Sequence, residues 1–184
     1  MNKYLYILIL LLFPCCSHQN EIHKDFNCKI THYKNLEKLQ DLKNKFSIEL
    51  PKSWKTNFFF DTLQSSIYTA DTTKQLTETL LLDITIINQN IKFDGIFKLK
   101  QKQENVAKNL TNIASGETIL INKPAYYTFS KGIKRSYSYQ VCHYFINTNA
   151  QNFIHVKAEV YGDSLVNNRL CKAFTLLEKI KLIK

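Results

Sequence analysis

Beyond residue 45, most of the chain alternates between apolar and polar side chains, the period of strands that bury one face. In the segment 46–50, Phe46, Ile48 and Leu50 alternate with polar residues until Pro51, whose missing amide proton ends the ladder. The same alternation predicts further strands at residues 58–61, 65–69, 80–87, 112–122, 124–130, 134–147 and 152–161. Strands therefore dominate the predicted fold.

Three segments have the spacing of helices instead. A short helix is predicted at residues 36–43, where leucine recurs at every third position. An amphipathic helix is predicted at 94–110, with lysines left to solvent and one side shared by Leu99, Gln103, Val106 and Leu110. A closing helix is predicted from Gly162-Asp163-Ser164, which offers cap residues, through Lys179, with an apolar stripe of Val166, Leu170, Phe174 and Leu177.

Many strands and few helices predict an α+β domain. The hairpin of the last two strands also allows a prediction of register. If its loop is 148–151, Asn147 lies opposite Asn152, and the residues Tyr139, Val141, His143 and Phe145 lie opposite Val160, Ala158, Val156 and Ile154. That face is almost wholly apolar, so we expect it to receive the closing helix.

The start of the chain combines Lys3, an uncharged apolar run at 4–13 and two adjacent cysteines. Ten apolar residues form a helix of about 15 Å, roughly half the hydrocarbon thickness of a bilayer. This is typical of a secretory signal, and the cysteine at its end indicates a lipoprotein. We predict a signal peptide at 1–15 and lipidation of Cys16. Lipidation of Cys15 is the alternative, although it would put Pro14 where a small residue is preferred, and a plain secretory signal is another.

The rest of the chain divides into a polar segment at 16–35, predicted to be a flexible tether, and a single domain at 36–184. Because acyl chains anchor a protein firmly, a membrane is the first predicted partner. Ser17 stands where an aspartate would retain a lipoprotein in the inner membrane. The predicted location is therefore the bacterial cell envelope, as an outer-membrane lipoprotein facing the periplasm. The loose lipoprotein motif resembles that of Bacteroidetes-type bacteria.

The formal charge is +10, and it comes from 23 lysines and only two arginines. Nucleic-acid-binding proteins usually use arginine for bidentate contacts with bases and phosphates. Here the basic residues are scattered along the chain and form no stripe. Nucleic acid is therefore not predicted as a partner.

Three cysteines remain after Cys16, namely Cys28, Cys142 and Cys171. An odd number leaves at least one of them free or paired between chains. A Cys142–Cys171 disulfide is one hypothesis, because the strand and the closing helix should lie close together. The predicted register turns Cys142 away from that helix, however, which favours buried free thiols.

The sequence offers little catalytic chemistry. The N-terminal cluster His18, His23, Cys28 and His32 lacks the spacing of paired zinc ligands, so neither a metal nor another cofactor is predicted. No Gly-x-Ser-x-Gly elbow or phosphate-binding loop is present. The neighbours Cys142 and His143 would point to opposite faces of a strand and could not act as a nucleophile and its base. The chain is therefore predicted not to be an enzyme.

One histidine suggests a binding site. In the predicted register, His143 lies on the apolar face with Tyr139 and Phe145, so these three residues could line a ligand pocket between sheet and helix. The alternative is a neutral core histidine with one hydrogen bond.

The segment KFSIELPKSW, with Phe46-x-Ile48-x-Leu50 followed by Pro51 and Trp54, resembles the opening of proteins of the PsbP superfamily. That group includes the photosystem PsbP proteins, the Ran-binding Mog proteins and exported DcrB-like lipoproteins. The order of elements from Phe46 to Ile183 is similar to theirs. The resemblance implies an antiparallel sheet flanked by helices in an α/β/α sandwich. It implies no common reaction, because members of that superfamily are mostly accessory or binding proteins.

The leading hypothesis is a non-enzymatic, lipid-anchored envelope protein that acts as an accessory or protein-binding module. The alternative is a binder of a small or lipidic ligand in a cavity between sheet and helix. A hydrolase ranks below both. A polar cleft with a hydrogen-bonded acid–base pair would favour it.

Overall fold

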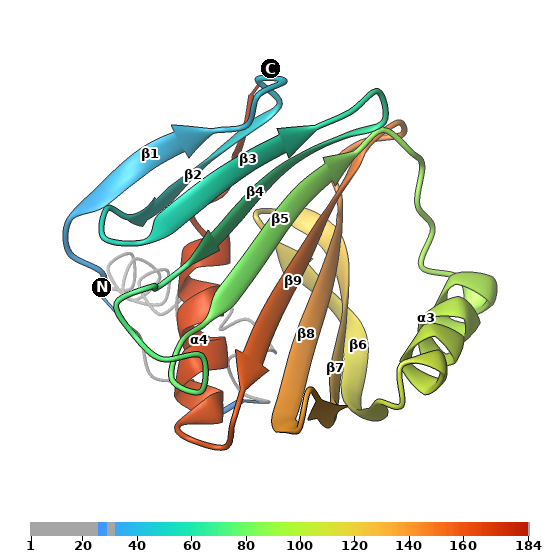
Figure 1. Ribbon diagram of the computed structural model, residues 1–184. Helices are drawn as coiled ribbons and strands as arrows, with labels where there is room; N and C mark the ends of the chain where they lie inside the picture. Colours follow the sequence, from blue (N-terminus) through green and yellow to red (C-terminus); the bar gives the residue numbers. More distant parts are fainter. Residues whose placement is uncertain (1–25, 29–31, 184) are drawn as a thin grey trace, which may run out of the picture.

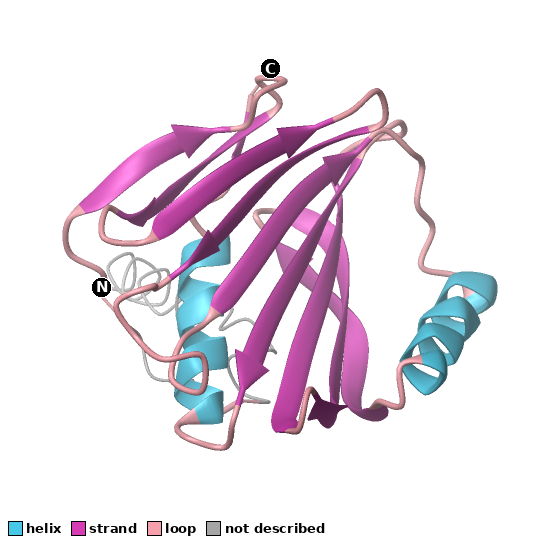
Figure 2. Ribbon diagram, in the orientation of Figure 1, coloured by secondary structure: helices cyan, strands magenta, loops and turns pink. Residues whose placement is uncertain are grey.

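A computed structural model describes residues 26–28 and 32–183 of the chain. In this part of the chain, ten strands form two antiparallel sheets that are accompanied by two helices (Figures 1 and 2). The elements are β1 (Leu36–Gln40), β2 (Phe46–Pro51), β3 (Lys55–Phe60), β4 (Gln64–Ala70), β5 (Leu81–Ile87), α3 (Gly95–Ala107), β6 (Thr111–Leu120), β7 (Lys123–Lys134), β8 (Tyr137–Asn147), β9 (Phe153–Tyr161), α4 (Val166–Leu177) and β10 (Lys181–Leu182). The predicted α+β fold is confirmed.

The larger sheet has seven strands in the order β3-β4-β5-β9-β8-β7-β6, and the smaller has the order β1-β2-β10. Helix α4 covers one face of the seven-stranded sheet, and α3 stands at the other side of the molecule (Figure 1). We call the face under α4 the inner face and the opposite one the outer face. None of the helices in the described part of the chain is long and apolar enough to cross a membrane.

The main core lies between α4, β2 and the inner face. Leu170, Ala173, Phe174 and Leu177 form the buried side of α4, as their spacing predicted. They meet the inward side chains of the central strands, which include Leu82, Ile84, Tyr144, Ile146, Ile154, Val156 and Ala158. Burying each such aliphatic side chain contributes about 1.5–3 kcal/mol, so this interface is the main source of stability.

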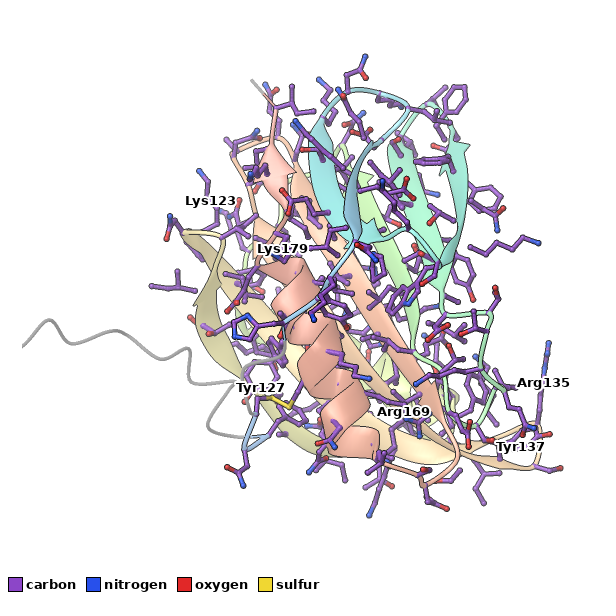
Figure 3. The ribbon with its side chains drawn as sticks, turned by 90° about the vertical axis from the view of Figure 1, so that its left-hand side faces the viewer. Lys123, Tyr127, Arg135, Tyr137, Arg169 and Lys179 are labelled. Carbon is purple, nitrogen blue, oxygen red and sulfur yellow. A yellow bond between two sulfur atoms is a disulfide. The ribbon has the colours of Figure 1, made fainter. Side chains whose placement is uncertain are left out.

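Arg169, near the start of α4, is buried rather than solvated (Figure 3). Its guanidinium donates to the backbone carbonyls of Thr79 at 3.0 Å, Tyr161 at 2.9 Å and Gly162 at 3.3 Å. Burial lowers the pKa of this guanidinium. The side chain therefore joins the start of α4 to the two loops beside it.

The prediction of a short helix at 36–43 is wrong, because these residues form β1 and the turn that follows it. Leu36 to Gln40 pair with Pro51 to Ser47 of β2. The carboxylate of Asp41 holds the turn by accepting N–H groups from Lys43, Lys45 and Phe46 at 3.0, 2.6 and 2.7 Å. A helix of eight residues is not stable by itself, and the backbone hydrogen bonds between β1 and β2 stabilise the extended conformation instead.

The predicted register of the last hairpin is wrong by one residue. The loop is longer than expected, because Asn147 pairs with Phe153 and the oxygen of Asn152 accepts the Thr148 amide. His143 therefore lies opposite Lys157, and Phe145 lies opposite His155. A slip of one residue exchanges the faces of a strand relative to its partner. His143 consequently lies on the outer face, and Cys142 lies on the inner face with the core.

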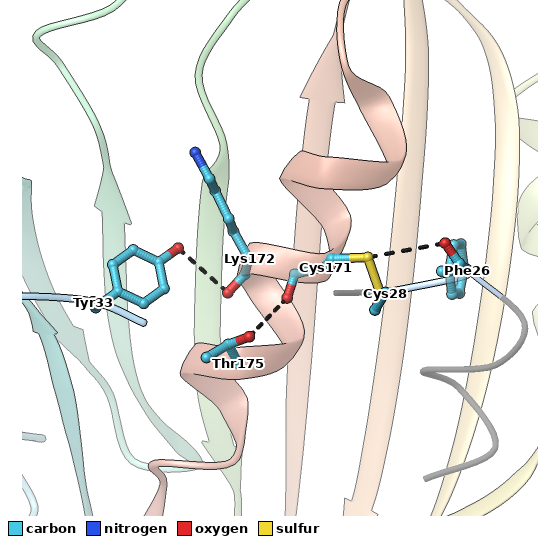
Figure 4. Close-up of a disulfide and its surroundings, with 6 residues drawn as sticks. All are labelled: Phe26, Cys28, Tyr33, Cys171, Lys172 and Thr175. Atoms are coloured by element: carbon cyan, nitrogen blue, oxygen red, sulfur yellow. Dashed lines mark hydrogen bonds between the residues drawn. A yellow bond between two sulfur atoms is a disulfide. The ribbon is translucent and has the colours of Figure 1, made fainter. Parts of the chain in front are cut away.

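Cys28 and Cys171 form a disulfide, with Cα atoms 5.4 Å apart (Figure 4). Cys142 is free and buried, so the hypothetical Cys142–Cys171 pair is wrong, and the favoured interpretation of buried free thiols is right for Cys142 but wrong for Cys28 and Cys171. Phe26 is also buried, with its ring centroid 4.9 Å from that of Phe129 and 6.0 Å from that of Phe174. The segment expected to be a tether at 16–35 is thus part of the folded body at Phe26 and Cys28. Cys15, Cys16 and the signal segment lie outside the described residues.

Candidate functional site

A pocket of about 330 Å³ opens on the outer face of the sheet, beside the end of α3. Strands β8 and β9 supply its floor, and the ends of α3 and β7 supply its walls. The lining residues are Lys108, Leu110, Ile133, Lys134, Tyr139, Val141, His143, Lys157 and Glu159. Polar and charged side chains therefore share the pocket with aliphatic ones.

Glu159 is the buried centre of the charged part of the pocket. Its Oε1 accepts hydrogen bonds from the Tyr139 hydroxyl at 2.6 Å and from the Lys134 ammonium at 3.0 Å, and its Oε2 lies 3.2 Å from the Lys157 ammonium. Burial by itself would raise the pKa of Glu159, but the hydrogen bond from Tyr139 and the two lysines outweigh burial and lower it. Glu159 is therefore ionised at neutral pH and holds two ammonium groups at the pocket.

Two histidines form a hydrogen-bonded pair at the pocket. His143 Nδ1 lies 2.9 Å from His155 Nε2, a contact that the observed register creates and the predicted register excluded. Burial, followed by the charges of Lys108 and Lys157, lowers the pKa of His143 to about 4. Burial and the neighbouring His143 lower the pKa of His155 to about 3. Both imidazoles are therefore neutral at pH 7.

The structure brings two of the three residues of the predicted pocket together. Tyr139 and His143 both line it, whereas Phe145 lies outside it. Phe145 belongs to an aromatic cluster with Tyr126, Phe153 and Phe97 that anchors the start of α3 to the sheet. Ligand binding by this group of residues stays a prediction.

Helix α3 is oriented differently from what its pattern suggested. Gln101 and Asn105 are buried, on the side that Phe97 turns toward the sheet. Within the helix the expected stripe is in solvent, with exposed fractions of 56% for Leu99 and 73% for Val106, whereas Leu110, which follows the helix, is buried. Ile96, one turn before Leu99, is 81% exposed. We call Ile96, Leu99 and Val106 the α3 stripe.

The aromatic contacts of Phe97 account for this orientation, because its ring centroid lies 5.6 Å from that of Tyr126 and 5.0 Å from that of Phe145 on the outer face. Gln101 and Asn105 follow Phe97 at intervals of four residues on the same side of the helix and are buried with it. Two features fix the helix in this position. Asp94 caps its start by accepting the Phe97 amide at 2.9 Å, and Lys98 pairs with Glu117 of β6.

The lining of the pocket limits its chemistry. It contains no serine, threonine or cysteine that could act as a nucleophile. Burial raises the pKa of the Cys142 thiol to about 12, and this residue lies on the inner face. Among the described residues, no three His, Cys, Asp or Glu side chains gather as a metal site requires. The one acid in the lining, Glu159, is hydrogen-bonded to Tyr139 and Lys134, and His143 bonds to a second neutral histidine, so no histidine of the lining is paired with an acid.

No protein-family model matches the sequence, and a comparison with curated proteins gives no match. Solved structures, however, resemble the fold over most of its length. The cyanobacterial PsbP protein (CyanoP) of Synechocystis has a TM-score of 0.55 at 12% identity, covering 84% of this chain and 96% of its own. The Saccharomyces cerevisiae Ran-binding protein Mog1p has a TM-score of 0.54 at 5% identity, covering 83% and 97%.

A third similar structure is LpqN of Mycobacterium tuberculosis, which is involved in cell envelope biogenesis. Its TM-score is 0.51 at 11% identity, covering 81% of this chain and 91% of its own. The chain thus has the PsbP/Mog1-like fold that the segment KFSIELPKSW suggested. Identities this low demonstrate the fold alone, and the function has to be argued from the site.

Sequence reasoning missed several residues of the site, namely Lys108, Lys134, Lys157 and Glu159. Lys108 caps the end of α3, Lys134 is the last residue of β7, and Lys157 and Glu159 lie in β9, so no local spacing connects them. One signal was present in β9, where Lys157 and Glu159 alternate with the apolar Val156, Ala158 and Val160. Charged residues in a central strand indicate a face that is not entirely packed in the core.

Proposed function

We propose that the chain is a non-enzymatic, lipid-anchored protein of the cell envelope that acts as an accessory, protein-binding module. The observation that carries this proposal is the α3 stripe. Three large apolar side chains at helical spacing lie in solvent, while two amide side chains of the same helix are buried. Exposed apolar groups that line up on one helix are typical of a surface that docks to a groove in a partner.

The solved structures with this fold agree with a binding role. Yeast Mog1p is described as a Ran-binding protein, and LpqN is involved in cell envelope biogenesis. The partner proposed here is an envelope protein with an apolar groove that accepts Ile96, Leu99 and Val106.

Crosslinking in the native membrane tests the docking surface. A photo-crosslinking amino acid at position 99 of the full chain should capture one defined protein. That protein should also copurify with the unmodified chain. Leu99→Gln should abolish the copurification, whereas Lys74→Gln, a change at an exposed residue of the β4–β5 loop, should leave it intact. If the partner copurifies equally with Leu99→Gln, the stripe is not the docking surface.

The lipid anchor has its own test, which is the intact mass of the protein extracted from its native membrane. Cleavage before Cys16 together with acyl chains gives a distinct mass. Cys16→Ser should release the protein from the membrane, and Cys15→Ser should leave it anchored. If Cys15→Ser releases the protein and Cys16→Ser does not, Cys15 carries the lipid. If the mass shows no acyl chains, the protein has no lipid anchor.

A second candidate function is the binding of a small or lipidic ligand between sheet and helix. The pocket beside the end of α3 favours it, because its volume and its mixed lining suit a small molecule. Native mass spectrometry of the extracted protein, before and after denaturation, would detect such a ligand as a difference in mass.

A further inference from the structure

We propose that the pocket on the outer face binds an amphiphilic anion, a carboxylate or a phosphate ester that carries one short apolar chain. This proposal rests on the second candidate function and adds the chemical class of the ligand. Such a ligand has two parts, and the pocket has a separate group of side chains for each.

The charge of the pocket selects an anionic head group. Lys108, Lys134 and Lys157 line the pocket, and Glu159 is the one carboxylate among its lining residues. Three ammonium groups and one carboxylate leave two positive charges, because His143 is neutral at pH 7. A concave site with walls of low dielectric strengthens this charge and concentrates small anions near it.

The geometry leaves hydrogen-bond donors for the head group. Glu159 uses one of its oxygens for Lys134 and the other for Lys157. An ammonium has three N–H donors, so Lys157 keeps donors beyond its ion pair with Glu159. The Lys134 ammonium also lies over the rings of Tyr139 and Tyr161, 4.6 and 5.5 Å from their centroids. Buried Glu159 therefore positions the two cations without neutralising both.

Two buried hydroxyls next to the pocket also lack partners. Thr128 lies beside His143 in the sheet, and Ser130 lies beside Val141. Neither hydroxyl forms a hydrogen bond with another described residue. Neither residue lines the pocket, so these hydroxyls add polarity behind its wall, while the contacts of the head group come from the lysines.

The apolar part of the pocket suits a short chain. Leu110, Ile133 and Val141 provide an aliphatic wall next to the charged group. The volume of 330 Å³ is at the lower end of the range for ligand pockets. A single chain of about eight carbons fits such a volume better than the two long chains of a membrane lipid would.

The test uses probes that share one chain and differ in head group. Octyl phosphate and octanoate are compared with neutral octanol and cationic octyltrimethylammonium, and inorganic phosphate serves as the head group alone. Binding to the full chain is measured by calorimetry, and ring resonances of ¹³C-labelled His143 and His155 report on the site. Vesicles of phosphatidylglycerol form a separate arm, because a membrane lipid could supply the same head group.

We expect the two anionic amphiphiles to bind at least roughly tenfold more tightly than octanol or the cation, and to shift both histidine resonances. Lys108→Gln should weaken octyl phosphate binding by roughly fivefold, because one unpaired cation is lost from a partly desolvated site. Lys102→Gln removes a charge from the same helix away from the pocket, and should leave the affinity unchanged. The unperturbed amide spectrum of each variant establishes that it is folded.

The outcomes separate the class of ligand from the function on which it rests. If octanol binds as tightly as octyl phosphate, the anionic class is wrong, while ligand binding in the pocket stands. If no amphiphile shifts the histidine resonances, both the class and the second candidate function are wrong. A shift with vesicles supports the anionic class with a lipid head group as its source. A shift with octyl phosphate and none with vesicles supports it with a free amphiphile as the source.

Discussion

Replacing Cys28 with alanine should destabilise the fold more than any other single surface change. The disulfide joins Cys28, in the first described segment, to Cys171 in the middle of α4, across 143 positions of sequence. Cys28 is only partly buried, so its truncation leaves little cavity. The loss of stability should therefore come from the broken crosslink rather than from lost packing.

The magnitude follows from the length of the closed loop. A crosslink over 143 positions lowers the entropy of the unfolded chain by about 17 cal/mol/K, which corresponds to about 5 kcal/mol at 25 °C. Measured effects are commonly smaller, because the unfolded chain retains some structure, so a loss of about 3–5 kcal/mol is expected. This is a large part of the total stability of a domain of this size, which is about 5–15 kcal/mol.

Urea denaturation followed by circular dichroism measures this loss. The free energy of unfolding of the wild type should fall to that of Cys28→Ala when a reductant is added, and the variant itself should not respond to the reductant. Phe26→Ala serves as a control for the packing of the N-terminal segment, since it removes a buried ring and keeps the disulfide. If the oxidised wild type and Cys28→Ala unfold at the same urea concentration, the crosslink does not stabilise the fold and the reasoning is wrong.

Three further changes have defined expectations. The pKa values of His143 and His155 are lowered to about 4 and about 3, so the unfolded chain binds more protons than the folded chain below pH 6.5. Stability should therefore fall as the pH drops from 7 to 5, by about 2 kcal/mol for His143 alone, and a flat profile in urea denaturation would contradict the neutral pair. Gly132→Ala would place a Cβ 2.8 Å from a backbone oxygen and should cost about 1–3 kcal/mol in thermal unfolding, whereas Gly95→Ala meets nothing within 4 Å and should be neutral. Arg169→Met would leave three backbone carbonyls without their donor and should cost about 3 kcal/mol or more, so a variant as stable as the wild type would refute that role.

The sequence predicted the positions of most strands and helices well, but it predicted poorly which strands pair and which faces are buried. Alternation is a local property of a strand, and it located the strands from β2 to β9 to within a few residues. It failed at β1, where leucines at 36, 39 and 42 have the spacing of a helix face and lack the period of two that marks a strand. Pairing with β2 decided in favour of the strand, and that pairing is not visible within five residues.

The candidate site shows the same division. Tyr139 and His143 could be selected from the sequence because a polar side chain interrupts an apolar strand. Their surroundings could not be inferred, because a loop one residue longer than expected exchanged the face on which His143 lies. The His143–His155 pair and the Glu159 network exist only in the observed register.

By itself, the sequence determined the fold class, the closing helix and the resemblance carried by Phe46 to Trp54, because all three depend on periodicity or local motif. The tertiary structure alone decided which side of α3 is buried, since Phe97 packs on aromatic side chains of the outer face and Gln101 and Asn105 lie on the same side of the helix. It also decided the partner of Cys171, because the folded chain brings residues 143 positions apart within bonding distance. The pattern of apolar and polar residues shows that a helix or strand has two different faces. Which other element each face contacts is decided only when the whole chain packs.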